Sequence, residues 1–121
     1  MGPTLGWMML PVVPEISVIS SAALTIPPYA SRVLLKAAVK SILLPSVSQW
    51  MLASLPQANV AAFDRSLWIK DYIYGASNGA PITIMPDGTD TIDALASFEV
   101  ISPGALIRLY PLTTADGWYV G

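Results

Sequence analysis

The stretch Pro81-Ile-Thr-Ile-Met-Pro-Asp-Gly-Thr-Asp-Thr-Ile-Asp93 places two isoleucine-containing runs on either side of a Pro-Asp-Gly turn. Apolar and polar side chains alternate in Ile82-Thr-Ile84, as they do in a half-buried β-strand. The Pro-Asp-Gly sequence supplies the residue types that tight turns require, and the chain after it resumes an extended pattern. The stretch therefore predicts a hairpin-like corner in a β-protein, with Ile82, Ile84 and Ile92 in the core.

Short strand patterns separated by turn residues recur on both sides of this corner. Eleven prolines punctuate the chain, which is typical of short strands, and the interval from Pro28 to Pro45 has room for a helix of several turns. We expect strands at Leu67–Asp71, Phe98–Ile101, Ala105–Tyr110 and Trp118–Val120. Strands at this spacing predict an all-β fold, either a compact β-sandwich or a jelly-roll-like domain.

Two segments are open between alternative structures. Residues 32–44 contain Lys36 and Lys40 four positions apart and are rich in Ala and Leu, which favours a helix. The same residues can form two short strands, Val33–Leu35 and Ser41–Leu44, and the surrounding pattern favours this alternative. Residues 48–54 fit a short helix or an irregular loop as well as they fit a strand.

The composition limits the function. Of the 121 residues, 54% are hydrophobic and only 12% are charged, whereas about 25% are charged in ordinary soluble domains. This balance predicts an apolar surface that a partner covers. The net charge is −2, and the six basic residues are spread along the sequence, which predicts no nucleic-acid partner. Residues 41–63 are uncharged, but their prolines and polar side chains argue against a membrane span.

The chain contains no cysteine and no histidine. It therefore lacks the commonest metal ligands and the side chain that most often serves as general base near neutral pH. Its acidic residues form no obvious catalytic pair in the sequence. We expect no enzymatic activity, no cofactor and no metal.

Three aspartates in the opening stretch are the one arrangement that suggests a cation. Asp87, Asp90 and Asp93 recur at every third residue, and their oxygens could bind calcium. The spacing is not that of an EF-hand loop, and an alternating strand would point Asp90 and Asp93 to opposite faces. The alternative is local hydrogen bonding at turns and strand ends, which is common for aspartate and which we favour.

The first 15 residues predict an extended apolar arm in front of a β-domain that covers residues 16–121. The arm has three prolines and carries four consecutive large apolar side chains, Trp7, Met8, Met9 and Leu10. They can pack into the core of the domain itself. They can also bind a partner, because the prolines hold the arm extended and so lower the cost of ordering it.

The order of the segments from Leu24 to Val120 carries a resemblance to a known family. The matching segments are Leu24–Ile26, Val33–Leu35, Ile42–Pro45, Leu67–Asp71, Ile82–Ile84, Asp87–Gly88, Thr91–Asp93, Ala96–Ser97, Leu106–Tyr110 and Gly117–Val120. In this order they resemble a small β-domain of tailed-bacteriophage virion proteins, found in capsid decoration (cement) proteins and in segments of head and tail fibres. The pattern departs at Ala94, where such domains usually have glycine, and in a longer insertion over residues 46–64.

The resemblance implies a structural role in the virion, at the surface of the phage capsid. It implies a homo-oligomer, expected to be a trimer, that binds the major capsid protein and bridges its subunits. A fibre segment normally belongs to a long protein, so a chain of 121 residues that begins with Met1 favours a decoration protein. The expected contacts with the capsid or a neighbouring subunit are Trp7, Met8, Met9, Leu10, Trp50 and Met51.

A second hypothesis is a fibre module that binds host carbohydrate. It depends on aromatic side chains that could stack on sugars, namely Trp68, Tyr72, Tyr74, Tyr110, Trp118 and Tyr119. Aromatic residues in strands are more often core residues or cross-strand partners. A third hypothesis is a small β-domain from a cell with no viral link.

Overall fold

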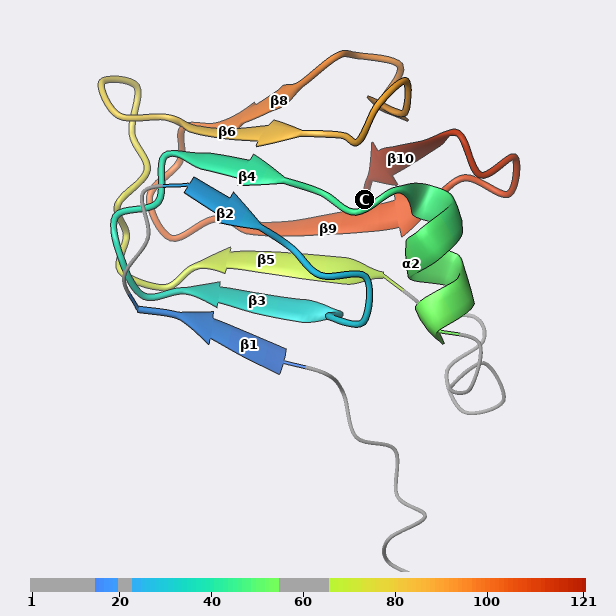
Figure 1. Cartoon of the computed structure of the whole chain (residues 1–121). Helices are drawn as coiled ribbons and strands as arrows, with labels where there is room; N and C mark the ends of the chain where they lie inside the picture. Colours follow the sequence, from blue (N-terminus) through green and yellow to red (C-terminus); the bar gives the residue numbers. More distant parts are fainter. Residues whose placement is uncertain (1–14, 20–22, 55–65) are drawn as a thin grey trace, which may run out of the picture.

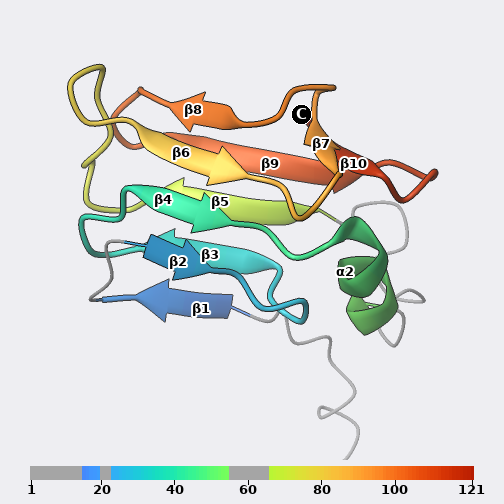
Figure 2. The same cartoon turned by 45° about the horizontal axis from the view of Figure 1, so that its top comes forward.

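The computed structural model describes residues 15–19, 23–54 and 66–121. These residues form two β-sheets, one lying over the other (Figure 1, Figure 2). The six-stranded sheet has the order β1-β3-β5-β9-β10-β7, and the four-stranded sheet has the order β2-β4-β6-β8. The strands are β1 (Glu15–Val18), β2 (Ala23–Thr25), β3 (Arg32–Leu35), β4 (Ser41–Leu43), β5 (Leu67–Asp71), β6 (Ile82–Met85), β7 (Thr91–Ile92), β8 (Phe98–Val100), β9 (Leu106–Pro111) and β10 (Gly117–Val120). The predicted all-β class is confirmed.

The first six strands alternate between the two sheets. Every second strand enters the same sheet. Within one sheet β1, β3 and β5 pair in parallel, and within the other β2, β4 and β6 pair in parallel. The parallel register places equivalent apolar residues beside one another, such as Leu24, Ile42 and Ile84 in the four-stranded sheet. This arrangement differs from a jelly roll, which is built from antiparallel strands.

The last four strands complete the two sheets on the side opposite β1 and β2. β8 pairs antiparallel with β6, β9 pairs antiparallel with β5, and β10 forms a hairpin with β9. The short strand β7 then pairs in parallel with β10. These pairings leave β1 and β2 as the edge strands at the opposite side of the two sheets.

The stretch 81–93 is a corner between sheets. Ile82, Ile84 and Ile92 have 4%, 0% and 0% exposure, which confirms that they belong to the core. The turn between the strands contains Gly88 with φ of 54°. The expected hairpin-like pairing is wrong, however, because β6 belongs to the four-stranded sheet and β7 to the six-stranded sheet. Local turn chemistry was visible in the sequence, but the partner of each strand was not.

The open segment 32–44 forms two strands, β3 and β4, rather than a helix. The composition of this segment favoured a helix. Its residues Val33, Leu35 and Ile42 are instead buried between the sheets, each at most 1% exposed. Tertiary packing therefore overrides helix propensity here.

The second open segment lies in the helix α2 (Val47–Ser54). The side-chain oxygen of Ser46 accepts a hydrogen bond from the Gln49 N–H at 3.1 Å, as an N-cap residue does. The Val47 N–H donates to Asp90 Oδ2 at 3.0 Å, which ties the start of the helix to the corner before β7.

The predicted arm lies outside the described residues up to residue 14, and β1 begins at Glu15. No helix within the described ranges is long and apolar enough to cross a membrane.

Candidate functional site

The outward face of the six-stranded sheet gathers aromatic and basic side chains. Side chains alternate along a strand, so each strand that sends apolar residues inward sends every second residue outward. The outward residues on β3, β5, β9 and β10, with the residues directly after β3 and β5, are Arg32, Leu34, Lys36, Trp68, Lys70, Tyr72, Leu106, Arg108, Tyr110 and Tyr119. We call this surface the outer face of the six-stranded sheet.

The centre of the outer face is a stack of three side chains on neighbouring strands. Trp68 pairs in register with Arg32 on one side and with Arg108 on the other. The Cζ atoms of Arg32 and Arg108 lie 4.8 and 4.5 Å from the centroid of the indole ring. Because β3 and β9 flank β5, the guanidinium groups approach the ring from opposite sides. We call these three residues the Arg–Trp–Arg stack.

Further cation–aromatic contacts lie toward the end of β5. The ammonium group of Lys36 lies 5.0 Å from the ring centroid of Tyr72. Lys70 lies 5.5 Å from the ring of Tyr74 and donates a hydrogen bond to the Gly104 carbonyl oxygen. Four cations therefore share the outer face and its margin.

An aromatic pair marks the other end of the outer face. The rings of Tyr110 and Tyr119 are stacked across β9 and β10, with centroids 5.2 Å apart. Tyr119 is 44% exposed.

The outward face of the four-stranded sheet is chemically different. The residues that alternate with its buried positions are mostly small or hydroxylated, and its one charged side chain among the described strands is an acid. These outward residues are Ala23, Thr25, Ser41, Leu43, Thr83, Met85 and Glu99. The outer face of the six-stranded sheet is thus the stronger candidate for binding a charged partner.

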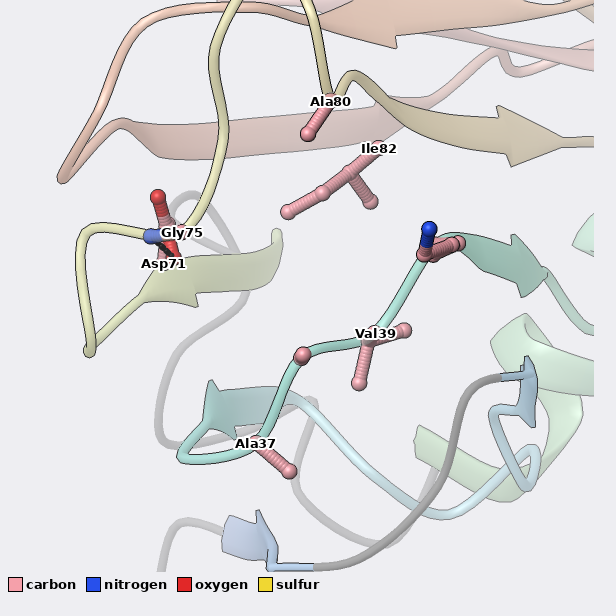
Figure 3. Close-up of a pocket in the computed structure, with 8 residues that line it drawn as sticks. Ala37, Val39, Asp71, Gly75, Ala80 and Ile82 are labelled. Carbon is pink, nitrogen blue, oxygen red and sulfur yellow. Dashed lines mark hydrogen bonds between the residues drawn. The ribbon is translucent and has the colours of Figure 1, made fainter.

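A buried carboxylate lies at the end of β5, beside a small cavity. Asp71 is 2% exposed, and its oxygens accept hydrogen bonds from the N–H groups of Gly75, Ala76 and Gly104 at 2.9, 2.9 and 3.0 Å. The cavity measures about 50 Å³ and lies between Asp71 and the loop that connects β3 to β4 (Figure 3). Small-molecule sites usually enclose several hundred Å³, so this cavity is too small for such a ligand.

The environment of Asp71 favours the charged form. Burial raises the pKa of Asp71, but the hydrogen bonds from Ala76, Gly75 and Gly104 outweigh this effect, and the positive charge of Lys70 acts in the same direction. The pKa of Asp71 therefore lies below its ordinary value. All three donors belong to loops, so the carboxylate is a structural anchor that joins two loops to the end of a strand.

No protein-family model and no curated protein matches this chain. Among the described residues, the side chains with the strongest recognition chemistry are those of the Arg–Trp–Arg stack, in which Arg32 and Arg108 are exposed and Trp68 is half-buried.

The structure separates the residues that the sequence had assigned to partner contacts. Trp7, Met8, Met9 and Leu10 lie outside the described residues. Trp50 is not a surface residue, since it is 1% exposed and its indole N–H donates to the Ala30 carbonyl oxygen at 2.8 Å. Its ring also lies edge to face against Trp118, with centroids 5.4 Å apart.

Met51 follows Trp50 on the helix and is half-buried against the same core. The assignment of Trp50 to an exposed contact is thus corrected to a core position. An apolar residue within an insertion carries no sequence signal that distinguishes a core position from a surface contact.

The six aromatic residues considered for sugar binding do not form one platform. Trp118 is fully buried at 0% exposure, and Tyr110 and Tyr119 stack on each other. Tyr72 and Tyr74 are 54% and 66% exposed, and the Trp68 ring is in contact with the guanidinium groups of Arg32 and Arg108.

Two of the three aspartates of the opening stretch accept hydrogen bonds from backbone N–H groups distant in the sequence. Asp90 accepts the hydrogen bond from Val47, and Asp93 Oδ1 accepts one from the Val120 N–H at 3.2 Å. Among the described residues, no group of three or more acidic side chains is arranged to hold a metal ion.

Two functional features were missed by the sequence analysis. Arg32, Trp68 and Arg108 are far apart in the sequence, and strand alternation predicts an outward direction for each of them but not that their strands are neighbours. The anchoring role of Asp71 was also missed, although its position in the strand, in alternation with the apolar Leu67 and Ile69, was a signal that could have predicted its burial.

Proposed function

We propose that this chain is a structural virion protein, a capsid decoration (cement) protein that binds the outside of a phage head and bridges major capsid subunits. The resemblance to virion β-domains supports this proposal. So does the Arg–Trp–Arg stack, which is the observation that carries it. Trp, Tyr and Arg are the residue types most enriched among the energetically dominant contacts of protein interfaces, and here they occupy an exposed sheet face.

Within this proposal the two sheets are a compact β-sandwich that serves as a rigid scaffold. The jelly-roll alternative fits less well because of the parallel pairing. The protein forms a homo-oligomer, most simply a trimer at a three-fold junction of the shell. Several weak contacts that the oligomer makes with the shell at once raise its avidity. Because the oligomer binds only the intact shell, its binding stabilises the shell. Catalysis, a cofactor, nucleic acid and a membrane have no part in this function.

Co-sedimentation tests the proposal. The purified protein is mixed with heads of the phage in whose genome the gene lies, after the heads have been stripped of the protein. We expect saturable binding and an increase in the temperature at which the heads release DNA. Saturable binding to tails, with none to heads, would contradict the proposal.

The arm gives this experiment a second comparison. If Trp7, Met8, Met9 and Leu10 contact the shell, deletion of residues 1–14 weakens binding to heads. Unchanged binding would leave the outer face of the six-stranded sheet as the attachment surface and remove the arm from the proposal.

The carbohydrate-binding fibre module remains the second candidate because Tyr72 on the outer face and Tyr74 beside it are exposed. Binding of the isolated protein to a glycan array, without affinity for heads, would favour this candidate over a decoration protein.

A further inference from the structure

The charge of the outer face is opposite to that of the whole chain. The net charge is −2 and the pI is about 4.7. Four of the six basic residues nevertheless lie on this face or at its margin, namely Arg32, Lys36, Lys70 and Arg108. On the described strands of the six-stranded sheet, Glu15 on β1 is the one exposed acid. The face is therefore locally positive on a negative molecule.

The Arg–Trp–Arg stack holds two guanidinium groups in place without neutralising them. A cation–π contact attracts each guanidinium group to the ring without cancelling its positive charge, and a guanidinium group has five N–H donors, more than such a contact uses. Over the described ranges, neither Arg32 nor Arg108 has a carboxylate partner. A guanidinium edge matches the two oxygens of a carboxylate, and fixing its orientation beforehand lowers the entropy lost on binding.

The surroundings of the stack favour a protein over other anions. Leu34 and Leu106 lie beside the stack and Leu106 is 41% exposed, so the basic groups are mixed with apolar area, as in protein interfaces. A nucleic-acid-binding domain typically has a pI above about 9, far from the value here. Sugar stacking on Trp68 would have to displace the guanidinium groups from its ring.

We infer that the outer face of the six-stranded sheet binds an acidic segment of a partner protein, with Arg32 and Arg108 each receiving a carboxylate. The occupant follows from charge complementarity and from two guanidinium groups that have no carboxylate partner in the described part of the chain. The inference rests on the proposed function only for the identity of the partner, which would then be an acidic surface of the major capsid protein.

Binding of fluorescent poly-L-glutamate to the full-length protein at low salt tests the carboxylate site directly. We expect the double variant Arg32→Gln/Arg108→Gln to bind at least tenfold more weakly. The variant Lys40→Gln removes an exposed charge from the loop before β4 and is expected to bind like wild type. The conservative variant Arg32→Lys/Arg108→Lys keeps the charge but not the planar edge, so we expect intermediate binding.

If Lys40→Gln and the arginine variant weaken poly-L-glutamate binding equally, the inference is overturned. Binding would then depend on the net charge of the protein rather than on a specific site. Parallel titrations with oligodeoxythymidine and with heparin complete the test. Tighter binding of either polymer than of poly-L-glutamate, lost in the arginine variant, would assign the face to nucleic acid or to an anionic polysaccharide instead. Circular dichroism melts check that the variants are folded.

The head-binding assay separates this inference from the proposed function. Heads that bind the wild type and the arginine variant equally would refute the major capsid protein as the acidic partner of this face and leave the decoration role intact. Poly-L-glutamate binding that depends on the arginines, with no binding to heads, would refute the decoration role and leave the carboxylate site intact.

Discussion

At the scale of single residues, Asp71 shows how one polar group can replace a core aliphatic residue. The parallel register places Val18, Leu35 and Asp71 side by side on β1, β3 and β5. Val18 and Leu35 are 8% and 1% exposed, and Asp71 is 2% exposed. A buried carboxylate is costly unless it is hydrogen-bonded, and three backbone N–H groups meet this need.

We predict that Asp71→Asn lowers the free energy of unfolding by about 1–3 kcal/mol, because the amide cannot accept all three hydrogen bonds at full strength. Asp71→Leu matches the aliphatic neighbours in shape but leaves all three N–H groups without an acceptor, so it should cost more. Urea denaturation of the two variants measures both effects. A leucine variant as stable as wild type would contradict the anchoring role.

The same carboxylate predicts a dependence of stability on pH. The pKa of Asp71 in the folded state is lowered, whereas an unfolded aspartate has a pKa of about 3.9. Its contribution is therefore fully present above the unfolded pKa and is lost as pH falls through the folded pKa. Denaturation of wild type and Asp71→Asn between pH 7 and pH 2 should show a gap that narrows on the acid side. A gap that stays constant would refute this assignment.

At the scale of elements, the turn after β7 keeps a demanding backbone without glycine. Asp93 and Ala94 have φ of 51° and 65°, and Ile92 and Leu95 exchange two backbone hydrogen bonds around them. Positive φ at both central residues is the geometry of a type I′ turn, which favours glycine at the second position. The departure at Ala94 seen in the sequence has therefore not changed the turn into one with ordinary φ values.

We predict that Ala94→Gly raises the free energy of unfolding by about 0.5–1 kcal/mol. Relief of a left-handed alanine is worth roughly 1–2 kcal/mol, which exceeds the roughly 0.4–1 kcal/mol lost through the greater freedom of the unfolded chain. Ala96→Gly is the matched control, since Ala96 is exposed and has no positive φ. Denaturation should show a gain for the first variant and a small loss for the second. A loss for both would contradict this account of the turn.

The attachment of helix α2 to the sheets depends on two tryptophans with unequal hydrogen bonding. The Trp50 indole N–H reaches the Ala30 carbonyl oxygen, whereas the buried Trp118 indole N–H is without a partner among the described residues. Both rings are almost fully buried. Replacement by phenylalanine therefore removes a similar volume at either position but a hydrogen bond at only one.

We predict that Trp50→Phe destabilises the protein by about 1 kcal/mol more than Trp118→Phe, since only the former leaves a carbonyl oxygen without its donor. Thermal denaturation of the two variants side by side measures this difference. A larger loss for Trp118→Phe would contradict it.

The sequence predicted individual strands better than their arrangement. The expected strand Leu67–Asp71 coincides with β5, and the expected strands near Phe98, Leu106 and Trp118 agree with β8, β9 and β10 to within one residue at each end. Strand alternation and turn residues are local signals. The parallel pairing of β3 with β5 joins segments separated by residues 36–66, and no local pattern encodes it.

At the scale of the whole molecule, the two sheets bury an apolar core and leave two outer faces of different chemistry. The basic residues are scattered in sequence, which had argued against a nucleic-acid partner, but the fold collects four of them on one face or at its margin. The candidate site therefore could not be predicted before the strand order was known. Each side chain's outward direction was predictable, whereas its neighbours were not.

In our proposal, the outer face of the six-stranded sheet is the surface that binds the capsid. Hydrogen–deuterium exchange of the protein, free and bound to phage heads, tests it most directly. We predict slower exchange in β3, β5 and β9 on binding, with no change in the four-stranded sheet. Protection confined to β2, β4, β6 and β8, or unchanged exchange in β3, β5 and β9 of the head-bound protein, would contradict the claim.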